Sequence, residues 1–157
     1  MFSIEPAAPA EAETVALLVK ALLEEIMAAS GAAKFTLDFA ATVARCRDFL
    51  KSGEYTVLVA RQQHMAVGFI ALTETRSLYA GGIFGIIPEF YVKAEFRSCG
   101  LGARLLTAAR EHGQARGWVR LEVTTPPLPE FERTLSFYQS HGFAIAGGRK
   151  LKLGLAS

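Results

Sequence analysis

The chain has 157 residues, of which 51% are hydrophobic and 20% are charged. This length fits one domain with its own core, and the balance excludes disordered, collagen-like and low-complexity chains. The net charge of +2 comes from 17 basic and 15 acidic residues spread along the chain, which provides no concentrated basic surface for a nucleic acid or a membrane. We therefore expect a soluble globular protein with no nucleic-acid or membrane partner.

Targeting signals and metal motifs are also missing from the sequence. No apolar run approaches the roughly 18 residues of a membrane span, and the first five residues lack the basic start of a secretory signal. Cys46 and Cys99 lie far apart, and the three histidines are dispersed, so no spacing matches a disulfide framework or a metal site. These features predict a cytoplasmic protein with reduced thiols and no metal.

Hydrophobic periodicity and turn residues predict alternating strands and helices. A short strand, Phe2 to Ile4, should precede a helix that runs to about Ser30 and ends at Gly31, and Thr36 to Asp38 should cap a second helix that ends at Gly53. The elements that follow are a hairpin (55–60 and 66–73), a strand (83–92), a helix (101–116), a strand (118–124), a helix (about 130–140) and two short strands (143–146 and 150–153). This order predicts a single α/β domain, of the α+β kind, in which a mixed, mostly antiparallel sheet is flanked by about four helices.

Pro88 interrupts the predicted strand 83–92. Proline lacks the N–H that a sheet ladder needs, so it is tolerated only at an edge or at a bulge. We expect Pro88 to lie either at an edge or at a bulge of the sheet.

The segment from Arg97 to Gly102 matches a short pattern: arginine or glutamine, any two residues, glycine, any residue, and then glycine or alanine. It comes directly before a predicted helix. The same pattern occurs at 110–115 and 139–144, but these matches lie inside a helix and across a helix C-terminus. Only the first places free backbone amides, those of residues 98–103, where they can converge on a phosphate.

Two segments together, Pro88 to Leu106 and Phe137 to Phe143, resemble the GNAT superfamily of acetyl-CoA-dependent N-acetyltransferases. The resemblance implies a single N-acetyltransferase domain over residues 1–157, acetyl-CoA as co-substrate and an amine acceptor. It implies that the strand at 90–92 pairs with the pantetheine arm, that the glycine turn binds the pyrophosphate and that Tyr138 lies near the sulfur. The cofactor-binding residues it implies are Phe90, Tyr91, Val92, Arg97, Ser98, Cys99, Gly100, Leu101, Gly102 and Ala103.

The sequence departs from the family pattern at three positions. Ser98 and Cys99 stand where the family often has a glycine and a basic residue, which removes a charge that assists phosphate binding. Phe131 stands where an asparagine is common, so one polar contact near the cofactor is absent.

Glu89, Val92 and Tyr138 are the residues that fit the chemistry of acetyl transfer. Glu89 shares a strand face with Tyr91 and would take a proton from the amine directly or through water, unless it is a solvated or arginine-paired carboxylate. The amide of Val92 would stabilise the oxyanion if a bulge leaves it unpaired. The Tyr138 phenol, with an ordinary pKa near 10, would protonate the departing thiolate, unless it is only a core residue.

Two other functions fit parts of the sequence. A non-catalytic acyl-CoA or nucleotide-binding module would keep the fold and act as a sensor or interaction partner. A dinucleotide-dependent oxidoreductase is disfavoured, because the glycine turn comes late and lacks the G-x-G-x-x-G spacing. The sequence does not identify the acceptor substrate, and it is compatible with a monomer or a homodimer. Glu24 and Glu25 either attract a cationic acceptor or are solvated side chains.

Overall fold

The computed structural model describes residues 1–30, 36–126 and 131–155, which form two compact units, Met1–Thr124 and Thr125–Ser157. The first unit holds β1 (Phe2–Pro6), α1 (Ala12–Ser30), α2 (Phe39–Ser52), β2 (Tyr55–Gln62), β3 (Met65–Ser77), β4 (Gly82–Ile87), β5 (Phe90–Val92), α3 (Leu101–Ala115) and β6 (Leu121–Val123). Two short 3₁₀ turns, η1 (Pro9–Glu11) and η2 (Ala94–Phe96), precede α1 and α3. The second unit holds α4 (Glu132–Ser140).

The six strands form one sheet in the order β1-β2-β3-β4-β6, and β5 pairs with β3 beyond the end of β4. All neighbouring pairs are antiparallel except β4 and β6, which are parallel. This confirms the predicted fold class, a mixed and mostly antiparallel sheet with four helices.

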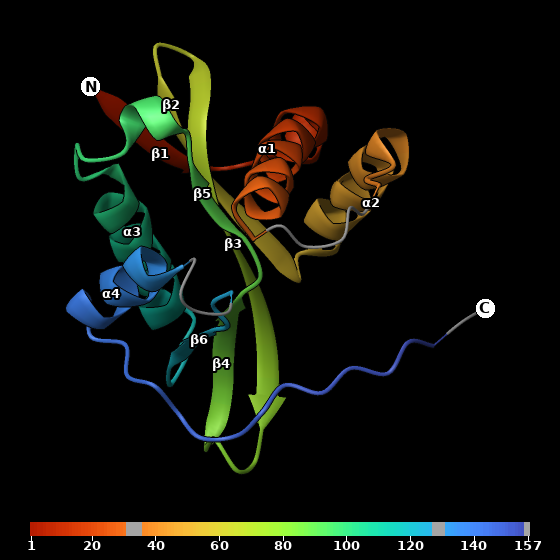
Figure 1. The fold of residues 1–157 in the computed structure, drawn as a ribbon. Helices are drawn as coiled ribbons and strands as arrows, with labels where there is room; N and C mark the ends of the chain where they lie inside the picture. Colours follow the sequence, from red (N-terminus) through yellow and green to blue (C-terminus); the bar gives the residue numbers. More distant parts are fainter. Residues whose placement is uncertain (31–35, 127–130, 156–157) are drawn as a thin grey trace. The chain divides into compact units, whose positions relative to one another are not determined.

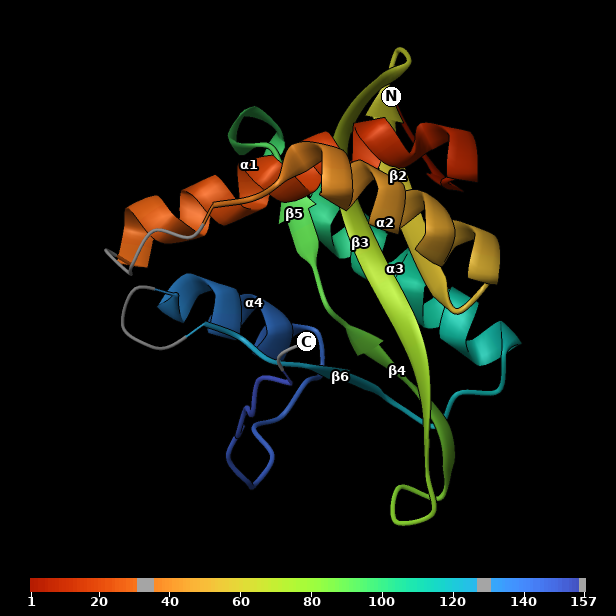
Figure 2. The same cartoon turned by 90° about the vertical axis from the view of Figure 1, so that its right-hand side faces the viewer.

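The first unit has two layers of helices around its sheet (Figure 1). On one face, α1 and α2 pack on alternate side chains of β2 and β3, namely Val57, Val59, Phe69 and Ala71. On the other face, α3 buries Leu101, Leu105, Leu106 and Ala109. Figure 2 shows α1 and α2 on the near side of the sheet and α3 behind it.

Local sequence signals explain several boundaries. Asp38 caps α2 by accepting a hydrogen bond from the amide of Ala41 at 3.0 Å, and Gly53 ends it in the left-handed conformation (φ 76°). The predicted strand 118–124 is shorter, because Trp118 instead turns its indole onto Gly85 and Gly113 and donates to Glu74 Oε1 at 2.7 Å. Gly31, the predicted end of α1, and Glu130, the predicted start of α4, lie outside the described residues.

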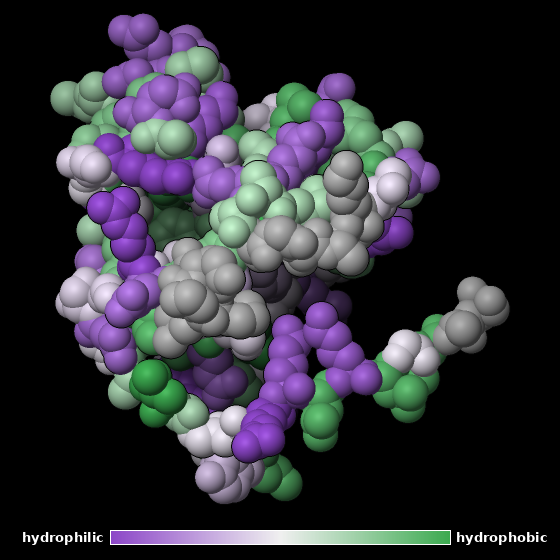
Figure 3. Space-filling view, in the orientation of Figure 1, coloured by the Kyte–Doolittle hydropathy of each residue, from purple (hydrophilic) through white to green (hydrophobic). Residues whose placement is uncertain are grey.

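The two predicted strands at 143–146 and 150–153 are wrong. Within 143–155 the structure has no strand, and the side chains of Ile145, Leu151, Leu153 and Leu155 are exposed. Figure 3 shows apolar and polar residues alternating along the extended C-terminal segment. Alternation predicts a strand, but a strand exists only where a second strand pairs with it, and no strand of the described residues pairs with this segment.

Candidate active site

Pro88 lies at a bulge, one of the two settings expected for it. Between the cross-strand pairs Thr73–Ile86 and Ile70–Phe90, β3 has two residues, whereas the opposite chain has three. The extra residue ends β4 and starts β5 in a new register, and the amide of Ala71 donates to the carbonyl of Glu89 at 2.9 Å. A bulge of this kind changes the face to which the following side chains point.

Glu89 lies on the face of the sheet that α1 and α2 cover. Its carboxylate accepts a hydrogen bond of 2.6 Å from the hydroxyl of Tyr55, at the start of β2. Burial raises the pKa of Glu89, and the Tyr55 hydrogen bond opposes that shift. The pKa of the Tyr55 phenol is raised, first by burial and then by the nearby Glu89 carboxylate, so the phenol stays a hydrogen-bond donor.

Two residues of α2, Phe49 and Cys46, lie near the Glu89–Tyr55 pair. The ring of Phe49 lies 5.4 Å from that of Tyr55, which holds the phenol in place. The buried thiol of Cys46 has a raised pKa, because of burial and the Glu89 carboxylate. Glu89 therefore sits in a partly buried site formed by β2, α2 and β5, with Tyr55 as its hydrogen-bond donor.

The edge of β5 opposite β3 carries backbone groups that the ladder does not use. The amide of Lys93 donates to the carbonyl of Val67 at 2.9 Å. In an antiparallel ladder only every second residue forms hydrogen bonds with the partner strand, so Tyr91 is bonded to β3 and Val92 is not. The N–H and C=O of Val92 consequently point away from β3. Gly68 lies opposite, and a Cβ there would stand 2.9 Å from the carbonyl of Tyr91, which explains why this close pair needs a glycine.

The glycine turn joins η2 to α3. Ser98 and Gly100 both adopt positive φ, 74° and 81°, and Gly100 is the residue before the helix. No side chain caps α3, its first turn has no acidic residue, and a Cβ on Gly100 would meet nothing within 4 Å. An exposed helix start with free amides and no competing carboxylate fits a pyrophosphate.

Arg97 begins this turn, but other parts of the protein hold its guanidinium. Its Nε donates to the carbonyl of Val92 at 2.8 Å, and its Nη2 donates to both carboxylate oxygens of Glu25 at 2.8 and 2.9 Å. The guanidinium carbon also stands 5.6 Å from the centre of the Tyr91 ring. The exposed thiol of Cys99 lies against the carbonyl of Phe96.

Tyr138 belongs to the second unit. It is 5% exposed, and the rings of Phe137 and Phe143 lie 5.5 and 5.2 Å from its own. Burial raises the pKa of its phenol, which keeps the proton on the oxygen at neutral pH. The structure thus brings Glu89, β5 and the glycine turn together in the first unit and places Tyr138 in an aromatic cluster of the second.

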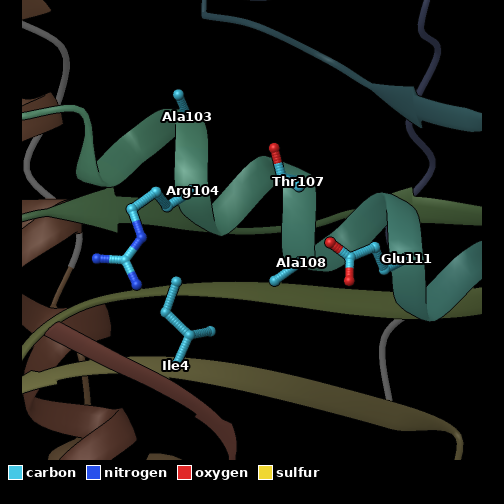
Figure 4. A pocket seen from close by; sticks show the side chains of 6 residues that line it. All are labelled: Ile4, Ala103, Arg104, Thr107, Ala108 and Glu111. Atoms are coloured by element: carbon cyan, nitrogen blue, oxygen red, sulfur yellow. The ribbon is translucent and has the colours of Figure 1, made fainter.

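An open groove of about 320 Å³ lies between β1 and the outer face of α3. Figure 4 shows its lining, with Arg104 and Glu111 at either end and Ile4 below them. It contains neither Glu89 nor the edge of β5, so it is separate from the candidate active site. Within the described residues no group of three histidine, cysteine or acidic side chains is placed to hold a metal ion, and no helix is long and apolar enough to cross a membrane.

Sequence reasoning missed two partners in the site, Tyr55 and Glu25. Tyr55 reaches Glu89 across two strand ladders, and Glu25 is 72 positions from Arg97 in the chain. No local spacing encodes either contact. Tyr55 could be predicted as a partner of Glu89 only from the strand register of both ladders. Glu25 could be predicted as a partner of Arg97 only from the packing of α1 beside β5.

The comparisons with known proteins identify the family and the fold. Residues 53–145 match the acetyltransferase (GNAT) domain model, and the chain belongs to this family of acetyl-CoA-dependent acyltransferases. No curated protein matched the sequence at a significant level.

Solved structures with the same fold cover almost the whole chain. A ribosomal-protein-alanine N-acetyltransferase of Brucella melitensis biovar Abortus 2308 is 18% identical, with a TM-score of 0.74 over 98% of this chain and 100% of its own. A GCN5-related N-acetyltransferase of Ralstonia eutropha JMP134 is 19% identical, with a TM-score of 0.76 over 98% and 99%. An aminoglycoside acetyltransferase from an uncultured soil metagenomic sample, in complex with sisomicin, is 17% identical, with a TM-score of 0.79 over 99% and 97%.

Proposed function

We propose that this acetyltransferase moves an acetyl group from acetyl-CoA to a primary amine of a small molecule or peptide by direct attack of the amine. The observation that carries this proposal is the Glu89 carboxylate, hydrogen-bonded by Tyr55 directly before β5, the strand whose Val92 amide points away from β3. We also propose that residues 1–157 work as one N-acetyltransferase domain, which the coverage of the solved relatives supports.

Glu89 acts as the base in this proposal. An ammonium group has no lone pair, so the amine must lose a proton before or during attack. Burial raises the pKa of Glu89, which makes its carboxylate a stronger base than an exposed glutamate. Glu89 receives the proton directly or through one water.

The backbone supplies binding and charge stabilisation. Acetyl-CoA brings the acetyl group as a thioester, which releases a thiolate when the amide bond forms. In our proposal the amides of residues 98–103 hold the pyrophosphate, residues 90–92 orient the pantetheine arm, and the N–H of Val92 donates to the developing oxyanion.

Tyr138 is the proposed general acid. Its raised pKa keeps it protonated at the pH where Glu89 is ionised, so the two groups carry opposite proton roles. Its aromatic neighbours, Phe137 and Phe143, restrict the ring.

The test screens purified protein with acetyl-CoA against amines, amino acids and peptides and follows thiol release. On the amine so identified, Glu89→Gln should lower turnover most in the pH range where Glu89 is ionised while the amine is still mostly protonated, and leave CoA affinity intact. A pH–rate profile that superimposes on that of the parent would assign Glu89 to structure alone. A parent protein that binds CoA and acetylates nothing in the panel would instead support the non-catalytic binding module.

A further inference from the structure

Arg97 connects three elements that are distant in the sequence. One nitrogen of its guanidinium bonds the end of β5 at the Val92 carbonyl, another bonds Glu25 of α1, and its backbone starts the glycine turn. The amide of Arg97 itself donates to the carbonyl of Ala94 at 3.2 Å, which closes η2. The side chain of Arg97 therefore links the start of the turn to both β5 and α1.

These contacts differ from what a direct role in phosphate binding would need. The Glu25 carboxylate already receives two hydrogen bonds from the guanidinium and neutralises its charge. The side chains of Arg97 and Glu25 are 41% and 44% exposed, and pairs with such exposure contribute little to global stability. Their main effect is consequently on local geometry.

We propose that Arg97 is a positioning residue, and that Glu25 is its partner: together they fix the glycine turn in the conformation that binds the pyrophosphate. This inference rests on the proposed function only in assigning the pyrophosphate to residues 98–103. Ser98 has a positive φ that a serine rarely adopts, so the surrounding contacts must hold it there. A turn fixed before binding loses less conformational entropy on binding, which raises the affinity for the ligand.

The competing explanation is that Arg97 contacts the phosphates directly. The two explanations predict opposite effects of Glu25→Gln. If Arg97 binds phosphate, removal of the Glu25 charge frees the guanidinium, and CoA affinity rises or stays constant. If Arg97 positions the turn, loss of its partner loosens the turn, and CoA affinity falls although a negative charge has been removed.

The experiment measures CoA affinity by calorimetry for the parent, Glu25→Gln, Arg97→Gln and the double variant. We expect each single variant to weaken binding by about threefold or more, and the double variant to be no weaker than Arg97→Gln alone. Glu24→Gln is the matched control, because Glu24 is an exposed neighbour with the same charge and no ion pair in the described part of the chain. Unchanged or tighter CoA binding by Glu25→Gln would overturn the proposal.

A second measurement needs no cofactor. The amides of Phe96 and Arg97 are hydrogen-bonded to the carbonyls of Lys93 and Ala94, so their hydrogen exchange reports the order of the segment that enters the turn. Exchange should be faster in Glu25→Gln and Arg97→Gln than in the parent and in Glu24→Gln, with little change in melting temperature. Parent-like exchange in both variants would reject the positioning role whether or not the protein acetylates an amine, and a parent that shows no thiol release would refute only the proposed function.

Discussion

Tyr55→Phe is the substitution that isolates the environment of Glu89. It removes one oxygen atom, the donor of the 2.6 Å hydrogen bond to the Glu89 carboxylate, and keeps the ring that packs on Phe49. Because this hydrogen bond lowers the pKa of Glu89 and burial raises it, the variant should leave burial unopposed. The pKa of Glu89 should therefore rise above that of the parent.

The size of the shift follows from the kind of bond lost. A hydrogen bond to a charged group contributes roughly 1.5–3 kcal/mol, whereas a neutral one contributes about 1 kcal/mol. The ionised form of Glu89 thus loses about 0.5–2 kcal/mol more than the protonated form, and one pKa unit corresponds to about 1.4 kcal/mol. We expect an upward shift of about one unit.

The same shift has a consequence for stability. A carboxyl whose folded pKa lies above its unfolded value favours the folded state most at low pH, and this advantage is lost as the pH rises through the folded pKa. In Tyr55→Phe the pKa of Glu89 in the folded state is higher than in the parent. The loss of stability with rising pH therefore continues to a higher pH and is larger in total than in the parent. The difference in the free energy of unfolding between parent and variant should consequently grow as the pH rises above the range where Glu89 is protonated.

The assay is a pH titration of the Glu89 carboxyl by ¹³C NMR, with the pH dependence of kcat/KM on the amine that the screen identifies. The acid limb of that profile should move to higher pH in step with the NMR value. Tyr79→Phe removes the same atom from a tyrosine that is 96% exposed in the turn between β3 and β4, and it should change neither. A Glu89 pKa that stays constant or falls would refute the reasoning, and an acid limb that stays put while the NMR value rises would show that another group controls the rate.

Three further predictions concern other parts of the chain. Gly100→Asp should weaken CoA binding at least tenfold, about 1.4 kcal/mol, and more than Gly100→Asn, which tolerates the same positive φ without a charge; equal effects would rule out phosphate at this position. Tyr138→Phe should lower turnover by roughly 10²–10⁴ with little change in CoA affinity, and parent-like turnover would assign the ring to packing. Gly85→Ala should lower the melting temperature by about 2–10 °C, because its Cβ would occupy the space of the Trp118 indole; an unchanged melting temperature would mean that the indole moves freely.

Local signals in the sequence predicted those parts of the fold that depend on one or two neighbouring residues. Asp38 and Gly53 bound α2 because a cap and a left-handed C-terminus need specific side chains. Pro88, which has no N–H to donate, predicted an edge or a bulge, and the structure has the bulge. The strands expected at 143–146 and 150–153 failed, since a strand also depends on a partner that its own sequence does not specify.

The candidate site shows the same division. The glycine turn was readable, because positive φ and close backbone approach restrict the residue type at positions such as Gly100. The partners that define the environment of Glu89 and Arg97 were not readable, because Tyr55 and Glu25 reach them through tertiary contacts. A motif indicated where the backbone can bind a phosphate, but only the folded structure shows which side chains hold that backbone in place.

The bulge at Pro88 also determines which face Glu89 occupies. Ile86 pairs with Thr73, which lies on the same face as Ala71 and the α1–α2 core, so uninterrupted alternation would place Pro88 and Phe90 on that face and Glu89 on the other, toward α3. The extra residue reverses this order, and the carboxylate meets Tyr55 and Cys46 instead. Burying a carboxylate among apolar side chains is unfavourable, and the raised pKa of Glu89 reflects that cost. A strand without the bulge would avoid this cost, but it would also place the Glu89 carboxylate on the face away from Tyr55.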